Sequence, residues 1–171
     1  MNVRQARPED ARALATVFAA VAEEGHLATE PPVDVPARAE RFRAAIEDDG
    51  PDSYWLLEDG GRVVGHAGLH GTHAEGVLAR GMAILPEARG RGGGRALLEA
   101  LLEHAGSQGA HKVELEVWPD NARAIALYES AGFEVEGLRR DHYRRRDGSL
   151  RSAVLMARLL SQPASTDPAT R

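Results

Sequence analysis

Apolar residues recur every three or four positions near the start of the chain, at Leu14, Val17, Phe18, Val21 and Ala22. This spacing predicts an amphipathic helix over about residues 9–24, after a short, weakly alternating strand over 2–6. A second helix of similar character is expected from about 37 to 47. The proline-rich stretch 28–36 between them reads as a loop within one domain, because helical patterns stand on both sides of it.

Runs of alternating or continuous apolar residues bounded by glycine and proline predict strands. They occupy residues 54–57, 62–67, 77–85, 112–118, 133–138 and 150–159. The first two runs flank Asp59-Gly60-Gly61, which is typical of a hairpin. A helix that opens at the glycine-rich turn 89–94 and another helix over 121–131 interrupt the later runs. This order of elements indicates a mixed α/β domain.

The composition fits one globular domain. The chain has 171 residues, of which 43% are hydrophobic and 27% are charged, and this length suits a single domain. We expect that domain to occupy residues 1–160, and the polar, proline-containing stretch 161–171 to form a flexible tail. Neither a bilayer-spanning apolar run nor a signal-peptide pattern is present, so we expect a cytoplasmic protein with no membrane partner.

Charge and cysteine content narrow the chemistry further. The formal net charge of −5 argues against a nucleic-acid partner held by a basic surface. The chain contains no cysteine, which excludes disulfides, thiolate nucleophiles and cysteine-ligated zinc. Its seven histidines form no H-E-x-x-H pattern, so we expect no metal site.

A glycine-rich turn stands between a predicted strand and a predicted helix, with the sequence Arg89-Gly90-Arg91-Gly92-Gly93-Gly94-Arg95. Backbone N–H groups at a helix N-terminus lack partners, and the helix dipole places positive charge there. Glycines let an anion approach the backbone, and the three arginines add side-chain charge. The turn therefore predicts a site for a polyvalent anion such as a pyrophosphate. The lysine and hydroxyl of a P-loop are missing, and a flexible turn with exposed arginines is the alternative interpretation.

A second motif begins where the strand 112–118 stops at a proline. Asn121 stands at the expected N-cap of the next helix, and Tyr128 follows seven residues later. Seven residues make two helical turns, so the amide and the phenol share one helix face and can both donate to a ligand beside it. The alternative is that Asn121 is only a cap and Tyr128 only a core aromatic.

Together the two motifs resemble the GNAT superfamily of acyl-CoA-dependent N-acyltransferases. The family's pyrophosphate pattern, Q/R-x-x-G-x-G/A, matches residues 89–94, and its N-x-x-A-x-x-L-Y-x-x-x-G-F pattern matches residues 121–133. The resemblance covers roughly residues 2–160. It implies a mixed α/β fold with a mostly antiparallel, twisted sheet of about six to seven strands, splayed between the fourth and fifth strands and flanked by about four helices.

The same resemblance implies an acetyl-CoA-dependent N-acetyltransferase, in which a primary amine attacks the thioester directly and no covalent enzyme intermediate forms. Backbone groups of the strand 82–84 would pair with the pantetheine arm and the acetyl carbonyl. The turn would hold the pyrophosphate, and Asn121 would contact the pantetheine. The cofactor-binding residues implied in this way are Met82, Ala83, Ile84, Arg89, Gly90, Arg91, Gly92, Gly93, Gly94, Arg95, Asn121 and Tyr128.

Direct transfer needs a neutral amine and a proton for the departing thiolate. The resemblance assigns the proton donor to Tyr128. We assign the general base to Glu116, which lies in the strand 112–118 beside the splay, although a glutamate on the solvent side of that strand is the alternative. Glu75, His70 and His73 are the fallback candidates for the base.

The substrate side is less determined by the sequence. Within the superfamily, residues 115–133 and 139–143 look most like ribosomal-protein N-terminal alanine acetyltransferases, so the acceptor is a protein N-terminus or a small-molecule amine. The loop 28–36 and the arginine-rich stretch 139–146 are expected to shape its pocket, the latter as an anion-binding element or a solvated hairpin. A homodimer also stays open, since related folds are often dimers. Two other classes remain: a non-catalytic acyl-CoA sensor and a nucleotide-binding domain.

Overall fold

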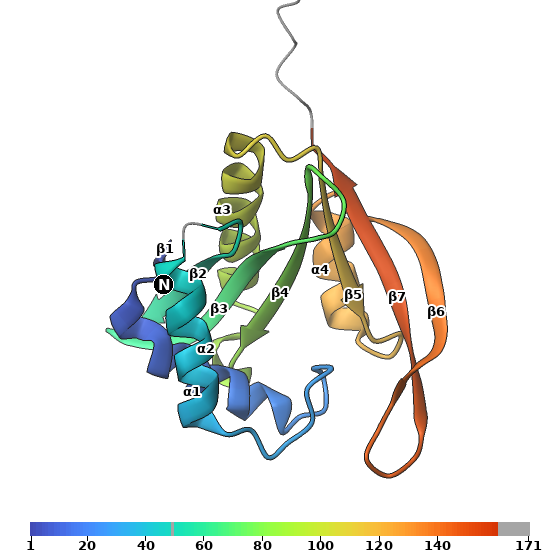
Figure 1. The fold of residues 1–171 in the computed structure, drawn as a ribbon, viewed down its shortest axis with the longest axis horizontal. Coiled ribbons are helices and arrows are strands. Elements are labelled where there is room, and N and C mark those ends of the chain that lie inside the picture. Colours follow the sequence, from blue (N-terminus) through green and yellow to red (C-terminus); the bar gives the residue numbers. More distant parts are fainter. Residues whose placement is uncertain (49, 161–171) are drawn as a thin grey trace, which may run out of the picture.

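The computed structural model describes residues 1–48 and 50–160, and one mixed sheet runs through them (Figure 1). The predicted tail, 161–171, lies outside the described residues. The seven strands are β1 (Asn2–Gln5), β2 (Ser53–Asp59), β3 (Arg62–Gly71), β4 (Val77–Ile84), β5 (Lys112–Val117), β6 (Glu134–Arg144) and β7 (Leu150–Leu159). Their order across the sheet is β1-β2-β3-β4-β5-β7-β6, and only β4 and β5 pair in parallel. The predicted mixed α/β fold is confirmed.

Four α-helices and two 3₁₀ turns complete the described chain. The helices are α1 (Ala11–Ala22), α2 (Val35–Glu47), α3 (Gly93–Ser107) and α4 (Ala122–Ser130), and the 3₁₀ turns are η1 (Pro8–Asp10) and η2 (Pro86–Ala88). The expected first helix is therefore divided, because a 3₁₀ turn precedes α1. The second begins at Val35, two residues before the expected start, because Asp34 accepts a capping hydrogen bond from the backbone N–H of Ala37.

The hairpin between β2 and β3 forms where the sequence predicted it. Gly60 and Gly61 have φ angles of +57° and +79°, and a two-residue loop with two positive φ angles suits the twist of paired strands. The final hairpin is longer than expected, because β6 extends to Arg144 before the turn at Asp147 and Gly148. Pairing across β6 and β7 is interrupted between Arg139 and Tyr143.

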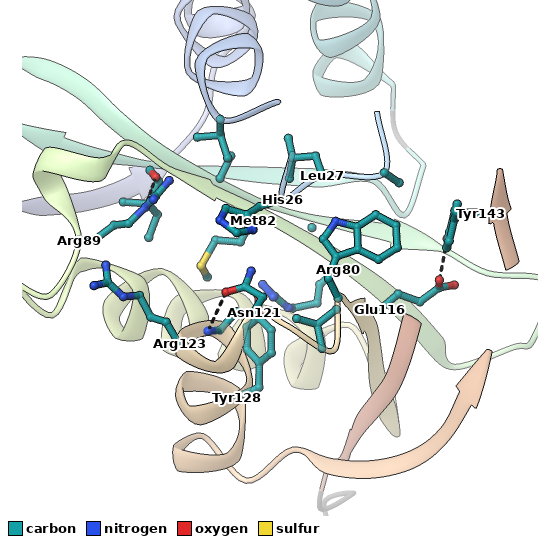
Figure 2. A pocket seen from close by; sticks show the side chains of 18 residues that line it. His26, Leu27, Arg80, Met82, Arg89, Glu116, Asn121, Arg123, Tyr128 and Tyr143 are labelled. Carbon is teal, nitrogen blue, oxygen red and sulfur yellow. Dashed lines mark hydrogen bonds between the residues drawn. The ribbon is translucent and has the colours of Figure 1, made fainter. Parts of the chain in front are cut away.

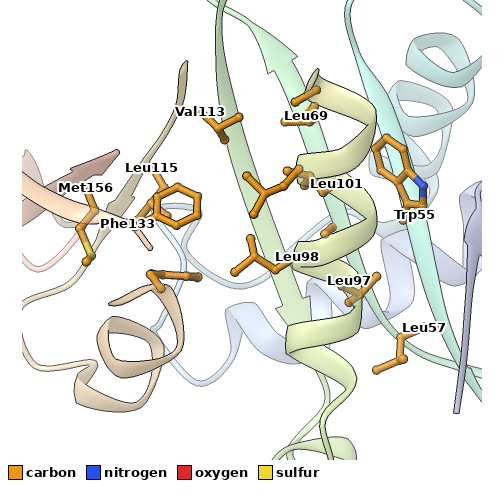
Figure 3. Packing of buried hydrophobic residues seen from close by; sticks show 14 of the residues in the cluster. Trp55, Leu57, Leu69, Leu97, Leu98, Leu101, Val113, Leu115, Phe133 and Met156 are labelled. Atoms are coloured by element: carbon orange, nitrogen blue, oxygen red, sulfur yellow. The ribbon is translucent and has the colours of Figure 1, made fainter. Parts of the chain in front are cut away.

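The helices cover both faces of the sheet, with α1 and α2 on one face and α3 on the other (Figure 1). Fully buried leucines of α3 pack against strands on either side of the opening in the sheet (Figure 3). They are Leu97, Leu98 and Leu101, which belong to the same buried cluster as Leu57 and Val113. At ~1.5–3 kcal/mol for each buried large aliphatic side chain, this packing fixes the position of the α3 N-terminus.

Candidate functional site

The sheet opens between β4 and β5, as the splay prediction requires. Pairing of the two strands is limited to Val77–Ala79 against Lys112–Glu114. Beyond Ala79, β4 continues to Ile84 and β5 to Val117 without pairing to each other. The edge of β4 that faces the opening therefore has backbone groups with no strand partner. Met82, Ala83 and Ile84, the three predicted pantetheine contacts, all lie in this segment.

A cavity of about 430 Å³ occupies the opening, and its lining comes from both halves of the sheet (Figure 2). The lining includes the predicted residues Met82, Ala83, Ile84, Arg89, Glu116, Asn121 and Tyr128. Residues 26–28, from the loop after α1, form part of its wall together with Trp118 and Tyr143. The structure therefore brings together seven of the predicted site residues, which are spread over almost fifty positions of the chain.

The glycine-rich turn ends at the N-terminus of α3. Gly92 is the N-cap, with a φ of +85°, and no side chain caps the helix. Because the first intrahelical bond runs from Ala96 N to Gly92 O, the N–H groups of the first turn are available to an anion. A Cβ atom on Gly90 or Gly92 would meet no atom within 4 Å, so both glycines face open space. This geometry fits the pyrophosphate of a CoA thioester.

The three arginines of the turn do not point freely toward that space. Arg89 donates to both carboxylate oxygens of Glu24, at 2.7 and 2.6 Å, and to the carbonyl of Ile84 at 2.8 Å. This hydrogen bonding is the main reason that the pKa of Glu24 is lowered. Arg91 pairs with Asp59 and Arg95 with Glu99, at 2.7 and 2.9 Å. The guanidinium groups thus tie the turn to its neighbours, and the charge of each is balanced by a carboxylate.

Asn121, the residue before α4, and Tyr128 of α4 line the cavity (Figure 2). The side-chain oxygen of Asn121 accepts from Ala124 N at 3.3 Å, so the predicted N-cap is confirmed. Its amide nitrogen is left to donate to a ligand. Tyr128 is only 7% exposed and packs against Phe133, with ring centroids 6.0 Å apart. Asn121 therefore caps the helix and Tyr128 packs in the core, while both also line the cavity.

Glu116 lines the cavity from β5, with its carboxylate held on both sides. Arg139 donates to Oε1 and the hydroxyl of Tyr143 donates to Oε2, each at 2.6 Å. Burial, and then the bond to Glu116, raises the pKa of Tyr143 to about 12, so its phenol stays protonated at neutral pH. Each carboxylate oxygen keeps a second lone pair. Glu116 is thus a fixed, partly exposed acceptor at the mouth of the cavity.

The fallback bases lie elsewhere. His70 stands near the end of β3, with its Nδ1 atom 3.1 Å from a carboxylate oxygen of Asp52. His73 and Glu75 belong to the loop between β3 and β4, which joins the paired end of β4 rather than its splayed end. None of the three lines the cavity. His70 lies on β3, and the loop that carries His73 and Glu75 joins β4 before the strands part.

Long-range contacts join the loop after α1 to other elements that line the cavity or flank it. The loop after α1 meets the hairpin of β6 and β7, where Arg145 Nε lies 3.6 Å from Glu30 and Arg145 also donates to the carbonyl of Ala28. The indole N–H of Trp118 donates to the carbonyl of Gly25 at 3.1 Å. Both segments that the sequence assigned to the acceptor pocket, 28–36 and 139–146, therefore contribute to these contacts.

The sequence reasoning missed two arginines of the cavity, Arg80 and Arg123. Arg80 is only 8% exposed, although arginine is rarely buried without a partner. A charged residue within an otherwise apolar strand was the available signal. Arg123 is exposed in the first turn of α4, beside the amide of Asn121 (Figure 2).

Comparisons with known proteins agree with this geometry. Residues 18–133 match the model of the acetyltransferase (GNAT) family. The chain is 30% identical over 141 residues to the uncharacterized N-acetyltransferase YhfO of Bacillus subtilis, a match that covers 80% of this chain and 91% of that protein. It is 43% identical over 76 residues to the ribosomal protein bS18-alanine N-acetyltransferase of Escherichia coli, which covers 44% of this chain and about half (51%) of that protein.

A solved structure shares the whole architecture. The ribosomal-protein-alanine N-acetyltransferase from Brucella melitensis superposes with a TM-score of 0.83 and 26% sequence identity, over 94% of this chain and 100% of that one. Among the residues that the structure describes, no helix is long and apolar enough to cross a membrane.

Proposed function

The chain belongs to the acetyltransferase (GNAT) family, and on that premise we propose which of its residues perform the transfer and which amine accepts. As a member of the family it is an N-acetyltransferase that uses acetyl-CoA. The observation that carries the proposal is the cavity in the splayed sheet, with the α3 N-terminus near one end and Tyr128 and Glu116 in its wall.

We propose that the backbone of residues 90–95 holds the pyrophosphate of acetyl-CoA. The helix dipole and the unpaired N–H groups supply the attraction, and the paired arginines hold the turn in place. The pantetheine arm would then lie along the unpaired edge of residues 82–84 and bond to its backbone groups, as an extended segment bonds to a strand edge. The amide nitrogen of Asn121 would donate to the same arm.

The proposed chemistry is direct attack of the amine on the thioester. Glu116, held by Arg139 and Tyr143, takes a proton from the attacking amine, directly or through water. Tyr128 supplies the proton to the sulfur that leaves. The amine nitrogen forms the new bond to the carbonyl carbon, the bond from carbon to sulfur breaks, and the sulfur keeps the electron pair. No enzyme nucleophile is needed, and the chain has no cysteine that could serve as one.

For the acceptor, we propose the α-amino group of a polypeptide. The matches to alanine N-acetyltransferases of ribosomal proteins support this choice, one in sequence and one in structure. An α-amine has an ordinary pKa of ~7.7–8.0 and a lysine of ~10.4, so an α-amine needs less help from a partly exposed carboxylate to lose its proton at neutral pH. The homodimer and the cytoplasmic location stay predictions.

The test is an acceptor panel with acetyl-CoA, read as release of the CoA thiol. It contains a peptide with a free N-terminal alanine, the same peptide with a blocked N-terminus and an internal lysine, a polyamine and an amino-acid analogue. We expect turnover on the free N-terminus and none on the blocked peptide. Turnover on a small amine alone would overturn the acceptor class. Calorimetric binding of acetyl-CoA without thiol release from any arm would favour the sensor alternative.

A further inference from the structure

Arg80 places a buried guanidinium at the closed end of the cavity. The last pair between β4 and β5 is Ala79 with Glu114, so Arg80 is the first residue of β4 after the strands part. It is 8% exposed, and its Nε and Nη1 atoms are buried without a hydrogen-bond partner. Within the described part of the chain it forms no salt bridge, and its guanidinium carbon lies 4.1 Å from the ring centroid of Tyr128.

This arrangement is costly unless something else approaches the guanidinium. A buried charge needs an opposite charge or several hydrogen bonds to offset its lost hydration. The ring of Tyr128 supplies only the weaker attraction between a cation and an aromatic face. The unsatisfied donors belong to a residue that lines the cavity (Figure 2). A ligand that becomes negatively charged at this end of the cavity would complete the site.

The direction of β4 indicates which part of the substrate reaches Arg80. A strand rises by ~3.3 Å per residue, so the five residues from Leu85 back to Arg80 span roughly 16 Å. The pyrophosphate site lies just beyond Leu85, so an extended arm laid along β4 carries its thioester toward Arg80. Tyr128, the proposed proton donor to the sulfur, contacts the guanidinium. The group that becomes negative at this place is the sulfur of CoA.

We propose that Arg80 is a catalytic residue that stabilises the departing CoA thiolate. This inference rests on the proposed function and adds a residue that the family motifs do not contain. As the bond between carbon and sulfur breaks, the sulfur keeps the electron pair and its charge faces the guanidinium. The proton from Tyr128 then neutralises it. A thiolate held in this way is a better leaving group than one released into a neutral, dry cavity.

The test measures the thiol pKa of bound CoA, from the ultraviolet absorbance of the thiolate as the complex is titrated. The protein has no cysteine, so CoA contributes the only thiol, and a titration without CoA corrects for tyrosine. An opposite charge nearby lowers the pKa of an acid by ~1–3 units, and the reference is the thiol pKa of free CoA, titrated alongside. We expect the thiol pKa of bound CoA to be lowered in the wild type and lowered less in Arg80→Lys. In Arg80→Met it should equal the thiol pKa of free CoA.

Arg43→Met is the matched control, because it removes an exposed arginine of α2 that pairs only loosely with Glu40, at 3.9 Å. It should keep the thiol pKa of the wild-type complex. In turnover, Arg80→Met should lose ~10²-fold in kcat, with little change in the KM for acetyl-CoA. Equal thiol pKa values in the wild type and Arg80→Met would overturn the proposal.

Further measurements separate the other outcomes. If CoA gives no calorimetric heat with the wild type, the proposed function fails, and this inference with it. If CoA binds but its thiol pKa in the wild-type complex is not below that of free CoA, only the inference fails; this needs no variant and holds even if Arg80→Met does not fold. If Arg80→Met loses turnover with succinyl-CoA but keeps it with acetyl-CoA, Arg80 binds an acyl carboxylate, and the thiolate proposal is wrong.

Discussion

Tyr128 and Glu116 lie on different walls of the cavity, and each is held by contacts that leave part of its polar group available. The ring of Tyr128 is fixed by Phe133, which follows α4, and by Arg80 of β4. Glu116 is fixed by Arg139 and Tyr143 of β6. Fixed acid and base groups on two walls suit a reaction in which one proton is removed from the amine and another is given to sulfur.

Tyr128→Phe removes the phenol oxygen and keeps the ring that packs in the core. We expect kcat to fall by ~10²-fold or more, within the range for loss of a general acid. The unfolding midpoint should change little, because the contacts with Phe133 and Arg80 involve the ring. Single-turnover kinetics with acetyl-CoA check the chemical step, and an unchanged rate of that step would remove the assignment.

Glu116→Gln keeps the shape of the side chain and removes its charge. We expect kcat/KM to fall by ~10²-fold near pH 7, the lower part of the range for a general base. Because an α-amine loses its proton near pH ~8 without help, the deficit should shrink as the pH rises. Glu40→Gln on α2, an exposed glutamate that does not line the cavity, is the control. A deficit that is constant from pH 6 to ~10 would indicate a structural role for Glu116.

The turn and α3 form one element whose start is set by close packing. Gly93 follows the N-cap, and a Cβ atom there would come within 2.4 Å of Leu57 Cδ2 on β2. The space at Gly94 is less restricted, since a Cβ atom there would lie 3.1 Å from Leu127 and 3.2 Å from Ile84. Gly93 and Gly94 allow α3 to pack closely against its neighbours. Gly90 and Gly92 instead adopt positive φ angles in the part of the turn that faces open space. One motif thus combines a packing requirement with an anion site.

Gly93→Ala should destabilise the domain and weaken acetyl-CoA binding together, since a shift of α3 moves its N–H groups. We expect a loss of ~1–3 kcal/mol in the free energy of unfolding, the usual cost of overpacking. Gly106→Ala is the control in the same helix, because its Cβ would meet nothing within 4 Å, and it should gain ~0.5–1 kcal/mol from helix propensity. Urea unfolding measures the free energy of unfolding, and calorimetry measures the binding of acetyl-CoA. A Gly93→Ala variant as stable as the wild type would contradict the packing argument.

At the scale of the whole molecule, the two faces of the sheet carry different cores. The face under α1 and α2 contains His66, 5% exposed, stacked on Phe18 at 6.3 Å and edge-on to Phe42 at 5.4 Å. Both ring nitrogens lack a hydrogen-bond partner among the described residues. Burial, followed by the charges of His70 and Arg38, lowers the pKa of His66 to about 4.

Because His66 is neutral in the folded protein, we expect the free energy of unfolding to decrease at acid pH. Between pH 6.5 and 4 the unfolded chain binds a proton at His66 that the folded chain does not, so stability falls as the pH falls. The lowering from 6.5 to about 4 corresponds to a loss of about 3 kcal/mol, complete near pH 4. His66→Phe removes this component, so its stability should decrease less than that of the wild type from pH 7 to 4. Parallel losses in urea unfolding would show that His66 is not responsible.

The sequence by itself determined the features that depend on neighbours along the chain. The hairpin at Gly60 and Gly61, the N-cap Asn121 and the turn before α3 follow from local sterics and local hydrogen bonds, which short stretches of sequence specify. The order of elements and the two motifs were therefore enough to indicate the family. Element ends were less determined: α2 starts earlier and β6 ends later than predicted, because capping and strand pairing extend them.

Only the tertiary structure decided which charges meet. Arg89 pairs with Glu24 across 65 positions, Arg145 of the last hairpin pairs with Glu30 of the loop after α1, and Glu116 finds its partners on β6. No local spacing encodes such contacts, because they depend on how the sheet opens and how the helices pack on it. The same holds for Arg80, whose burial against Tyr128 exists only where β4 and β5 separate.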